Sequence, residues 1–164
     1  MSDISVEDHF AAAAERHFHD GDFLHGHDRL PNADYHFGFA VECALKSMLL
    51  RFLGATMDPK PRPSGRPNTK PAIAPWFLDP ESGKPQEYGH LPWVESDIRL
   101  MSRRRTGARL TVALDRLSAF DRWSVHQRYL DGSDVDPSAV ESRRGVAHDV
   151  IDLHQLALLF KRLP

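Results

Sequence analysis

Hydrophobic residues recur with helical spacing between Asn32 and Leu53. One apolar stripe follows intervals of four, three, four and four residues, through Phe37, Val41, Ala44, Met48 and Phe52. A second apolar set lies roughly opposite it, at about 100° per residue, and comprises Tyr35, Phe39, Leu50 and Leu53. A helix that is apolar on two faces is usually buried on two sides. The pattern predicts a central bundle helix, or one that also meets another subunit.

The end of the chain has a second strong helical pattern. Asp136 is suited to cap the helix and Pro137 to occupy its first position, and the pattern runs to about Leu163. Its stripe has intervals of four, three, four and three residues, through Val146, Val150, Leu153, Ala157 and Phe160. The apolar surface of this segment and of residues 32–53 exceeds what one bundle face requires, so we expect a homodimer.

Weaker patterns predict the remaining helices. Ser5 to His19 carries a serine cap, acids in its first turn and an alanine run, with Gly21 as the expected end. His90 to about Arg103 and Arg109 to Phe120 also have helical spacing, and Trp123 to Leu130 is short or irregular. No alternation typical of a strand is present. The sequence predicts an all-α bundle of four or five helices.

A proline-rich segment separates the second and third predicted helices. Eight of the twelve prolines fall between Ala55 and Glu87. Proline removes a backbone donor and fixes φ, so we expect neither helix nor sheet across residues 55–88. Trp76, Phe77 and Leu78 are candidates to anchor the middle of the segment on the bundle. The interpretation is an insertion within one domain of residues 1–164, and not a domain boundary.

Composition narrows the class of protein. The net charge of −2 gives no chain-wide attraction to nucleic acid or membrane, and no apolar run is long enough to span a bilayer. The lone cysteine, Cys43, excludes an intrachain disulfide, and it is expected to be a small buried hydrophobic residue. The acidic N-terminus does not resemble a signal peptide. We therefore expect a cytoplasmic protein.

Three short motifs suggest a family. Ala40, Glu42, Leu45 and Lys46 form an A-x-E-x-x-L-K pattern on the second predicted helix. Gly89-His90-Leu91 resembles the G/T-H-D-L start of a following helix, with Leu91-Pro92 in place of the acid, and Arg128-Tyr129 precedes the last helix. Together these motifs resemble the HEPN (higher eukaryotes and prokaryotes nucleotide-binding) superfamily. The resemblance covers roughly residues 32–53 and 90–159, and it excludes the proline-rich insertion.

The resemblance implies a first hypothesis, metal-independent RNA cleavage by a toxin or defence component. Many HEPN proteins carry an arginine, four to six intervening residues and a histidine, and this chain has Arg143 and His148. His148 would act as general acid or base, and Arg143 or Arg144 would hold the phosphate. On a regular helix Arg143 and His148 are about 140° apart, whereas Arg144 and His148 share a face. The alternative is an ordinary solvated face that includes Glu141.

The second hypothesis is a non-catalytic HEPN module. Members with a prominent Arg-Tyr pair resemble modules that bind a nucleotide, RNA or a protein partner, and Arg128 and Tyr129 fit that group. The competing interpretation makes Tyr129 a helix-end anchor packed into the bundle. Glu42 and Lys46 form either a buried ion pair or a pair lining a cleft. An antitoxin-like or nucleotidyltransferase-like partner protein would accompany a paired system.

Other polar clusters allow further interpretations. Five arginines lie within eleven residues and provide a candidate surface for nucleic acid, or else a solvated helix end: Arg99, Arg103, Arg104, Arg105 and Arg109. Two His-x-His pairs, His17/His19 and His25/His27, match no standard zinc spacing and are expected to be surface residues. We therefore expect no metal site and no cofactor.

Overall fold

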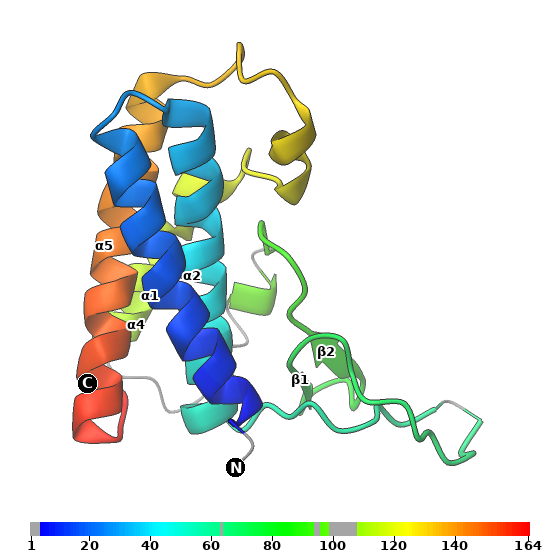
Figure 1. The fold of residues 1–164 in the computed structure, drawn as a ribbon. Coiled ribbons are helices and arrows are strands. Elements are labelled where there is room, and N and C mark those ends of the chain that lie inside the picture. The colour runs from blue at the N-terminus through cyan, green and yellow to red at the C-terminus, as the bar shows by residue number, and fades with distance from the viewer. Residues whose placement is uncertain (1–3, 63, 94–95, 99–107) are drawn as a thin grey trace.

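Three long helices form the body of the protein, as the computed structural model in Figure 1 shows. The structure describes residues 4–62, 64–93, 96–98 and 108–164. Helix α2 (Leu30–Phe52) packs against both α1 (Val6–His25) and α5 (Pro137–Phe160). The short helix α4 (Ala108–Asp115) and the 3-10 helices η1 (Arg116–Phe120) and η2 (Val125–Tyr129) complete the helical part. The broadly helical fold predicted from the sequence is therefore confirmed.

Helix α1 begins as predicted but continues beyond its expected end. Ser5 Oγ accepts a hydrogen bond from the backbone N–H of Asp8 at 3.2 Å and caps the helix. The helix passes through Gly21 and ends at His25, so the expectation that Gly21 ends it is wrong. A β-carbon on Gly21 would lie 2.9 Å from Cε1 of Phe37. Glycine is present there because α1 and α2 approach closely, and not because the chain turns.

Helix α2 is the central helix that its two apolar faces predict. Phe37, Val41 and Met48 are fully buried. Near the start of the helix, Gly38 lies against the indole of Trp123, whose Nε1 donates to the carbonyl oxygen of Asp34 at 3.0 Å. The chain after η1 is thereby fixed to α2.

Helix α5 matches its predicted bounds within three residues. Asp136 Oδ1 accepts from the N–H of Ser138 at 2.9 Å, and Pro137 occupies the first turn. The helix ends at Phe160, where Lys161 adopts the left-handed conformation with φ of 53°. The apolar stripe is buried as far as Ala157, whereas Phe160 is 56% exposed.

The insertion contains a small sheet that the sequence did not predict. Strands β1 (Trp76–Leu78) and β2 (Pro85–Glu87) pair antiparallel, with Trp76 opposite Glu87 and Leu78 opposite Pro85. The expectation of no strand is wrong because Pro85 is the first residue of its strand, a position at which proline costs the sheet no central hydrogen bond. Trp76 and Phe77 are buried as proposed, whereas Leu78 is 47% exposed.

The chain returns from the insertion to the bundle through residues 88–93. Tyr88, Leu91 and Trp93 are buried, and the rings of Tyr88 and Trp93 meet edge to face with centroids 5.0 Å apart. The helix predicted from His90 does not begin there: residues 90 and 91 form a bend, residues 92 and 93 have no regular structure, and residues 96–98 are helical. The rest of that predicted helix lies outside the described residues. None of the described helices is long and apolar enough to cross a membrane.

Candidate ligand-binding site

Hydrogen bonds from Arg143 connect α5 to α2 and to η1. Its Nη1 donates to Oδ2 of Asp34 at 2.6 Å, and its Nε donates to the carbonyl oxygen of Ala119 at 2.8 Å. The Arg143 side chain is 8% exposed and that of Asp34 is fully buried. Asp34, Arg143 and Gln127 are among the residues that line a cavity of about 200 Å³. His148 does not line it.

Arg144 and His148 lie on the seam between α5 and α1. Arg144 Nε donates to Oδ1 of Asp22 at 2.7 Å, and the His148 ring lies edge-on to Phe18 with centroids 6.1 Å apart. One turn earlier on α5, Glu141 lies 3.0 Å from Nε2 of His25. The two helices are therefore joined by paired side chains at successive turns, which agrees with the solvated-face interpretation.

Acidic residues surround the exposed side of His148. Its Nδ1 lies 3.8 Å from Oδ1 of Asp149 and 3.5 Å from Oδ2 of Asp152, and its side chain is 60% exposed. Carboxylates at this distance repel a phosphate group. The structure thus places Arg143 in the core and His148 at the surface beside Asp152 and Asp149, the latter paired with Arg116, and it does not bring Arg143 and His148 together.

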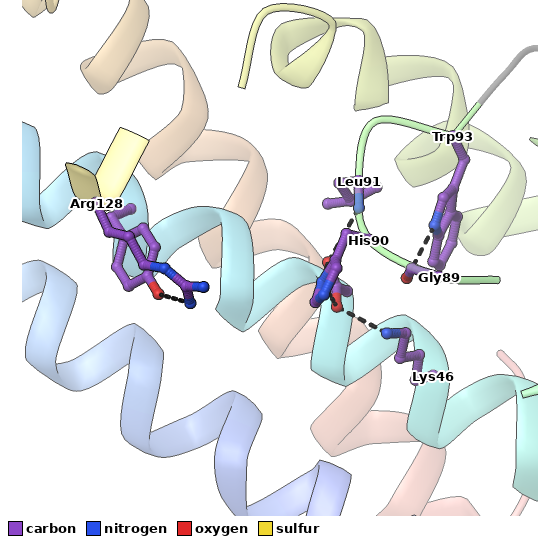
Figure 2. Close-up of polar contacts among 8 residues, drawn as sticks. Lys46, Gly89, His90, Leu91, Trp93 and Arg128 are labelled. Atoms are coloured by element: carbon purple, nitrogen blue, oxygen red, sulfur yellow. Dashed lines mark hydrogen bonds and ion pairs between the residues drawn. The ribbon is translucent and has the colours of Figure 1, made fainter. Parts of the chain in front are cut away.

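Glu42 lies at the centre of a buried polar cluster that joins the insertion to α2. It accepts from Nζ of Lys46 at 2.7 Å and from the backbone N–H of Leu91 at 3.0 Å, and Nδ1 of His90 lies 3.0 Å from its Oε1. Figure 2 shows Lys46, His90 and Leu91 gathered around this part of α2. The side chains of Glu42 and Lys46 are 3% and 7% exposed, so they form a buried ion pair and do not line a cleft.

A pocket of about 440 Å³ lies at the N-terminus of α2, and we name it the α2 N-terminal pocket. Arg29 precedes the helix as its N-cap residue and makes no capping hydrogen bond with its side chain. Nη1 of Arg128 donates to the hydroxyl oxygen of Tyr35 at 3.4 Å across the pocket (Figure 2). The lining residues are Arg29, Pro31, Asn32, Tyr35, His36, Gln127, Arg128, Leu130 and Asp131.

Aromatic rings lead from this pocket to the Glu42 cluster. The ring centroids of Tyr35 and Phe39 are 4.8 Å apart, and those of Phe39 and His90 are 6.1 Å apart. Trp123 packs edge-on against Phe39 with centroids 5.5 Å apart. These contacts fix the Tyr35 ring beside the pocket, so a planar group could stack there without first ordering the side chain.

The pocket combines two permanent cations with one neutral imidazole, that of His36. Hydrogen bonding to Tyr35 raises the pKa of Arg128 above its ordinary value. Burial lowers the pKa of His36, and burial also lowers that of His17, whose Nδ1 lies 3.1 Å from Nδ1 of His36. Positive charge in the pocket at neutral pH therefore comes from Arg29 and Arg128, and Asp131 opposes it from the rim.

Tyr129 does not pack into the bundle as its helix-end interpretation required. Its side chain is 71% exposed, and the guanidinium carbon of Arg128 lies 4.7 Å from the centre of its ring. The Arg128-Tyr129 motif is thus a stacked pair at the surface. Arg128 is held between two tyrosines, and it lines the α2 N-terminal pocket.

The other predicted clusters do not assemble into sites within the described part of the chain. Arg109 is exposed near the start of α4, whereas Arg99, Arg103, Arg104 and Arg105 lie outside the described residues. The His-x-His residues diverge, since His27 Nδ1 lies 2.8 Å from the carbonyl oxygen of Phe23 while His17 faces α2. Cys43 is buried and unpaired, and burial raises its thiol pKa to about 11, as expected of a packing residue.

The sequence patterns did not identify the other residues that form a pocket with Arg128. Tyr35 stood out only as a member of an apolar set, and Arg29 carried no motif. Asn32 was expected to cap the helix at its start, and this is wrong because α2 begins at Leu30 with Arg29 as its N-cap residue. A usable signal was present at residues 29–32, because an arginine stands where Ser, Thr, Asp or Asn would cap a helix, next to a proline. A long helix that begins without a side-chain cap leaves N–H groups free for a ligand.

The comparisons with known proteins gave no relative. No protein-family model matches the chain, and neither a curated protein nor a solved structure is significantly similar to it.

Proposed function

We propose that this chain is a HEPN-like module that binds a nucleotide through its phosphate groups in the α2 N-terminal pocket, and that it does not cleave RNA with Arg143 and His148. The observation that carries the proposal is the position of Arg143. Its guanidinium bonds Asp34 through Nη1 and the Ala119 carbonyl through Nε in the core, and His148 does not line the cavity that Arg143 borders, so the two side chains are not arranged around one phosphate. The second of the two sequence hypotheses is therefore favoured.

The chemistry of the pocket suits a phosphate. The pocket lies at the start of a 23-residue helix, where the helix dipole places partial positive charge and the N–H groups of Leu30 and Asn32 have no partner within the helix, whereas Pro31 has no N–H. Arg29 and Arg128 add two planar forks that can each grip a phosphate through paired hydrogen bonds. Repulsion from Asp131 is outweighed by two arginines and a helix end.

The pocket also offers partners for the rest of a nucleotide. The half-buried ring of Tyr35 presents a flat apolar surface on which a base can stack, in the way that aromatic side chains hold unpaired bases. Asn32 and Asp131 supply acceptors for ribose hydroxyls or base amino groups. A volume of about 440 Å³ falls within the range typical of small-ligand sites.

Calorimetric titration with ADP tests the proposal. We expect saturable binding to the intact protein and a loss of about tenfold or more in affinity for Arg128→Gln, because one charge-assisted hydrogen-bond donor is removed. Arg109→Gln is the matched control, an exposed arginine on α4 that should leave affinity unchanged. The proposal fails if ADP does not bind at millimolar concentration, or if both variants weaken binding equally.

Incubation with RNA in the presence of a metal chelator addresses the competing hypothesis. We expect the RNA to stay intact at high protein concentration. Cleavage that disappears in His148→Ala but persists in His126→Ala, another exposed histidine, would instead establish the RNA-cleaving function. It would also require Arg143 to leave Asp34 or Arg144 to leave Asp22.

A further inference from the structure

The insertion extends a basic arm from the body of the protein. We define the basic arm as residues 58–62 and 64–72, and Figure 1 shows it reaching away from the three long helices. It carries Lys60, Arg62, Arg66 and Lys70, and no acidic residue occurs between Asp58 and Asp79. A strongly basic segment in a chain of net charge −2 is a local concentration of charge that the average composition conceals.

Most of this charge is available to a partner. Lys60 forms an ion pair with Glu87 of β2, which fixes the base of the arm. Arg62, Arg66 and Lys70 are exposed, and none of the three makes an ion pair with another residue that the structure describes. Three unneutralised cations therefore lie within nine residues of the arm.

The arm is held in shape by its own contacts. At its base, Trp76 Nε1 donates to the carbonyl oxygen of Asp58 at 2.8 Å, and Thr56 pairs with Trp76 in an antiparallel bridge. Further out, Asn68 Nδ2 donates to the carbonyl oxygen of Lys60 at 2.9 Å, and Asn68 Oδ1 accepts from the N–H of Lys70 at 3.2 Å. The two sides of the arm are thus tied together.

Proline keeps the backbone between these ties extended. Pro59, Pro61, Pro67 and Pro71 have fixed φ and no N–H group, which favours an open conformation that does not collapse into helix or sheet. At the tip, Gly65 has a φ of +68°, and its N–H donates to the carbonyl oxygen of Arg62 at 3.0 Å. A pre-ordered arm loses little conformational entropy when a partner binds.

We propose that the basic arm is a docking surface for the phosphate backbone of a nucleic acid. From Asp58 to Ala72 the arm has no aromatic and no branched aliphatic residue. A protein interface depends on buried aromatic and aliphatic anchors, and the arm offers none. A phosphate backbone requires cations and neutral donors, and here Ser64 and Thr69 add exposed hydroxyl groups to the three charges.

The inference does not rest on the nucleotide pocket or on the family resemblance, which does not cover the insertion. Asn68 already bonds the Lys60 carbonyl and the Lys70 N–H, and the other polar groups of the arm are cations and hydroxyls, so we expect binding that depends mainly on phosphate contacts and counterion release. Three cations that each contact a phosphate of a single strand contribute about 2 to the slope of log affinity against log salt concentration.

Anisotropy of a fluorescent oligouridylate, measured over a series of KCl concentrations, tests the arm. We expect the variant R62Q/R66Q/K70Q to lower the magnitude of the slope by about 2 and to weaken binding on the order of tenfold or more at low salt. The control R16Q/K161Q/R162Q removes equal charge from exposed positions elsewhere and should keep most of the slope. A thermal unfolding midpoint close to that of the native protein shows that the arm variant is folded.

Three results would overturn the inference. In the first, the arm variant keeps the slope of the native protein. In the second, the control loses as much slope as the arm variant, which would show that net charge, and not the position of the charge, determines binding. A labelled oligoglutamate of equal length could bind with the same dependence on the arm, which would identify an acidic protein segment as the partner. A duplex DNA probe in the same experiment separates DNA from RNA as the source of phosphate.

Discussion

Asp34 and Arg143 lie 109 residues apart in the chain and meet in the core, where Nη1 of the arginine donates to Oδ2 of the aspartate at 2.6 Å. The pair connects α2 with α5, and the bond from Arg143 to the Ala119 carbonyl adds the end of η1. The arginine that the motif assigned to RNA chemistry is therefore a structural residue. Its neighbour in the sequence, Arg144, faces α1.

Removal of Arg143 should strongly destabilise the fold. We expect Arg143→Ala to lower the free energy of unfolding by about 3–5 kcal/mol, because it leaves the Asp34 carboxylate buried without its cation. Burial raises the pKa of Asp34, and Arg143 opposes that shift. The loss of unfolding free energy in Arg143→Ala should therefore be smaller at acidic pH, where the Asp34 carboxyl group takes up a proton. Denaturant unfolding at several pH values measures this, and a loss below about 1 kcal/mol at neutral pH would show that the pair is not a core contact.

Glu42 should act as the anchor of the chain that returns from the insertion. Glu42→Gln leaves Lys46 buried without a counter-charge and is expected to cost about 3–5 kcal/mol of unfolding free energy. Glu42→Leu combined with Lys46→Met should recover much of this loss. In the double variant the Leu91 amide loses its acceptor, because leucine carries no oxygen, so its hydrogen exchange should accelerate. Slow exchange at Leu91 in the double variant would contradict the assigned contact.

Stability should fall as the solution becomes mildly acidic, and His154 should contribute to that fall. Burial, with a smaller contribution from Arg51, lowers the pKa of His154 to about 4. The unfolded chain binds a proton at about pH 6.5. The neutral, buried His154 therefore leaves the unfolding free energy at its full value above that pH. As pH falls toward 4, the unfolding free energy decreases by up to about 1.4 kcal/mol per pH unit.

A pair of variants isolates the contribution of His154. His154→Asn should show a shallower dependence of unfolding free energy on pH than the native protein. Ser47→Ala removes the hydroxyl 3.0 Å from His154 Nε2 but leaves the imidazole buried, so it should keep the native slope at lower overall stability. Equal slopes for His154→Asn and the native protein would contradict the assignment.

Alanine substitution at two glycines should change the stability of the protein in opposite directions. A β-carbon on Gly38 would lie 1.9 Å from Cε2 of Trp123, so we expect Gly38→Ala to cost about 3 kcal/mol or more. Gly145 lies inside α5, where the nearest atom to an added β-carbon is Nη2 of Arg116 at 3.8 Å, so Gly145→Ala should stabilise by up to about 1 kcal/mol. Thermal unfolding distinguishes the two, and a Gly38→Ala protein as stable as the native chain would show that the indole lies elsewhere.

The long helices were predictable because their signals are local and repeated. Helical spacing and the caps at Ser5 and Asp136 placed α1 and α5, and the two apolar faces of α2 identified it as central. The predicted end of α1 at Gly21 was wrong, because the sequence does not distinguish a glycine that ends a helix from one that leaves space for the ring of a neighbouring helix. The sheet was missed because its strands have only three residues each and one begins with proline.

The candidate site was less predictable because it depends on contacts between distant segments. Residue types and the Arg-x4-His spacing gave Arg143 a plausible role, but nothing local revealed that Asp34 lies beside it. The i,i+4 pair of Glu42 and Lys46 was predictable from one helix, whereas the approach of His90 across the insertion was not. Arg128 was recognised by a motif, whereas its partner Tyr35 lies 93 residues earlier in the chain.

Mapping the ADP site by backbone amide NMR tests the central claim most directly. The account predicts chemical-shift changes on titration at Asn32, Tyr35 and Arg128 around the α2 N-terminal pocket, with amides near His148 unaffected. Shift changes concentrated between Arg144 and Asp152 of α5, with the pocket silent, would contradict it.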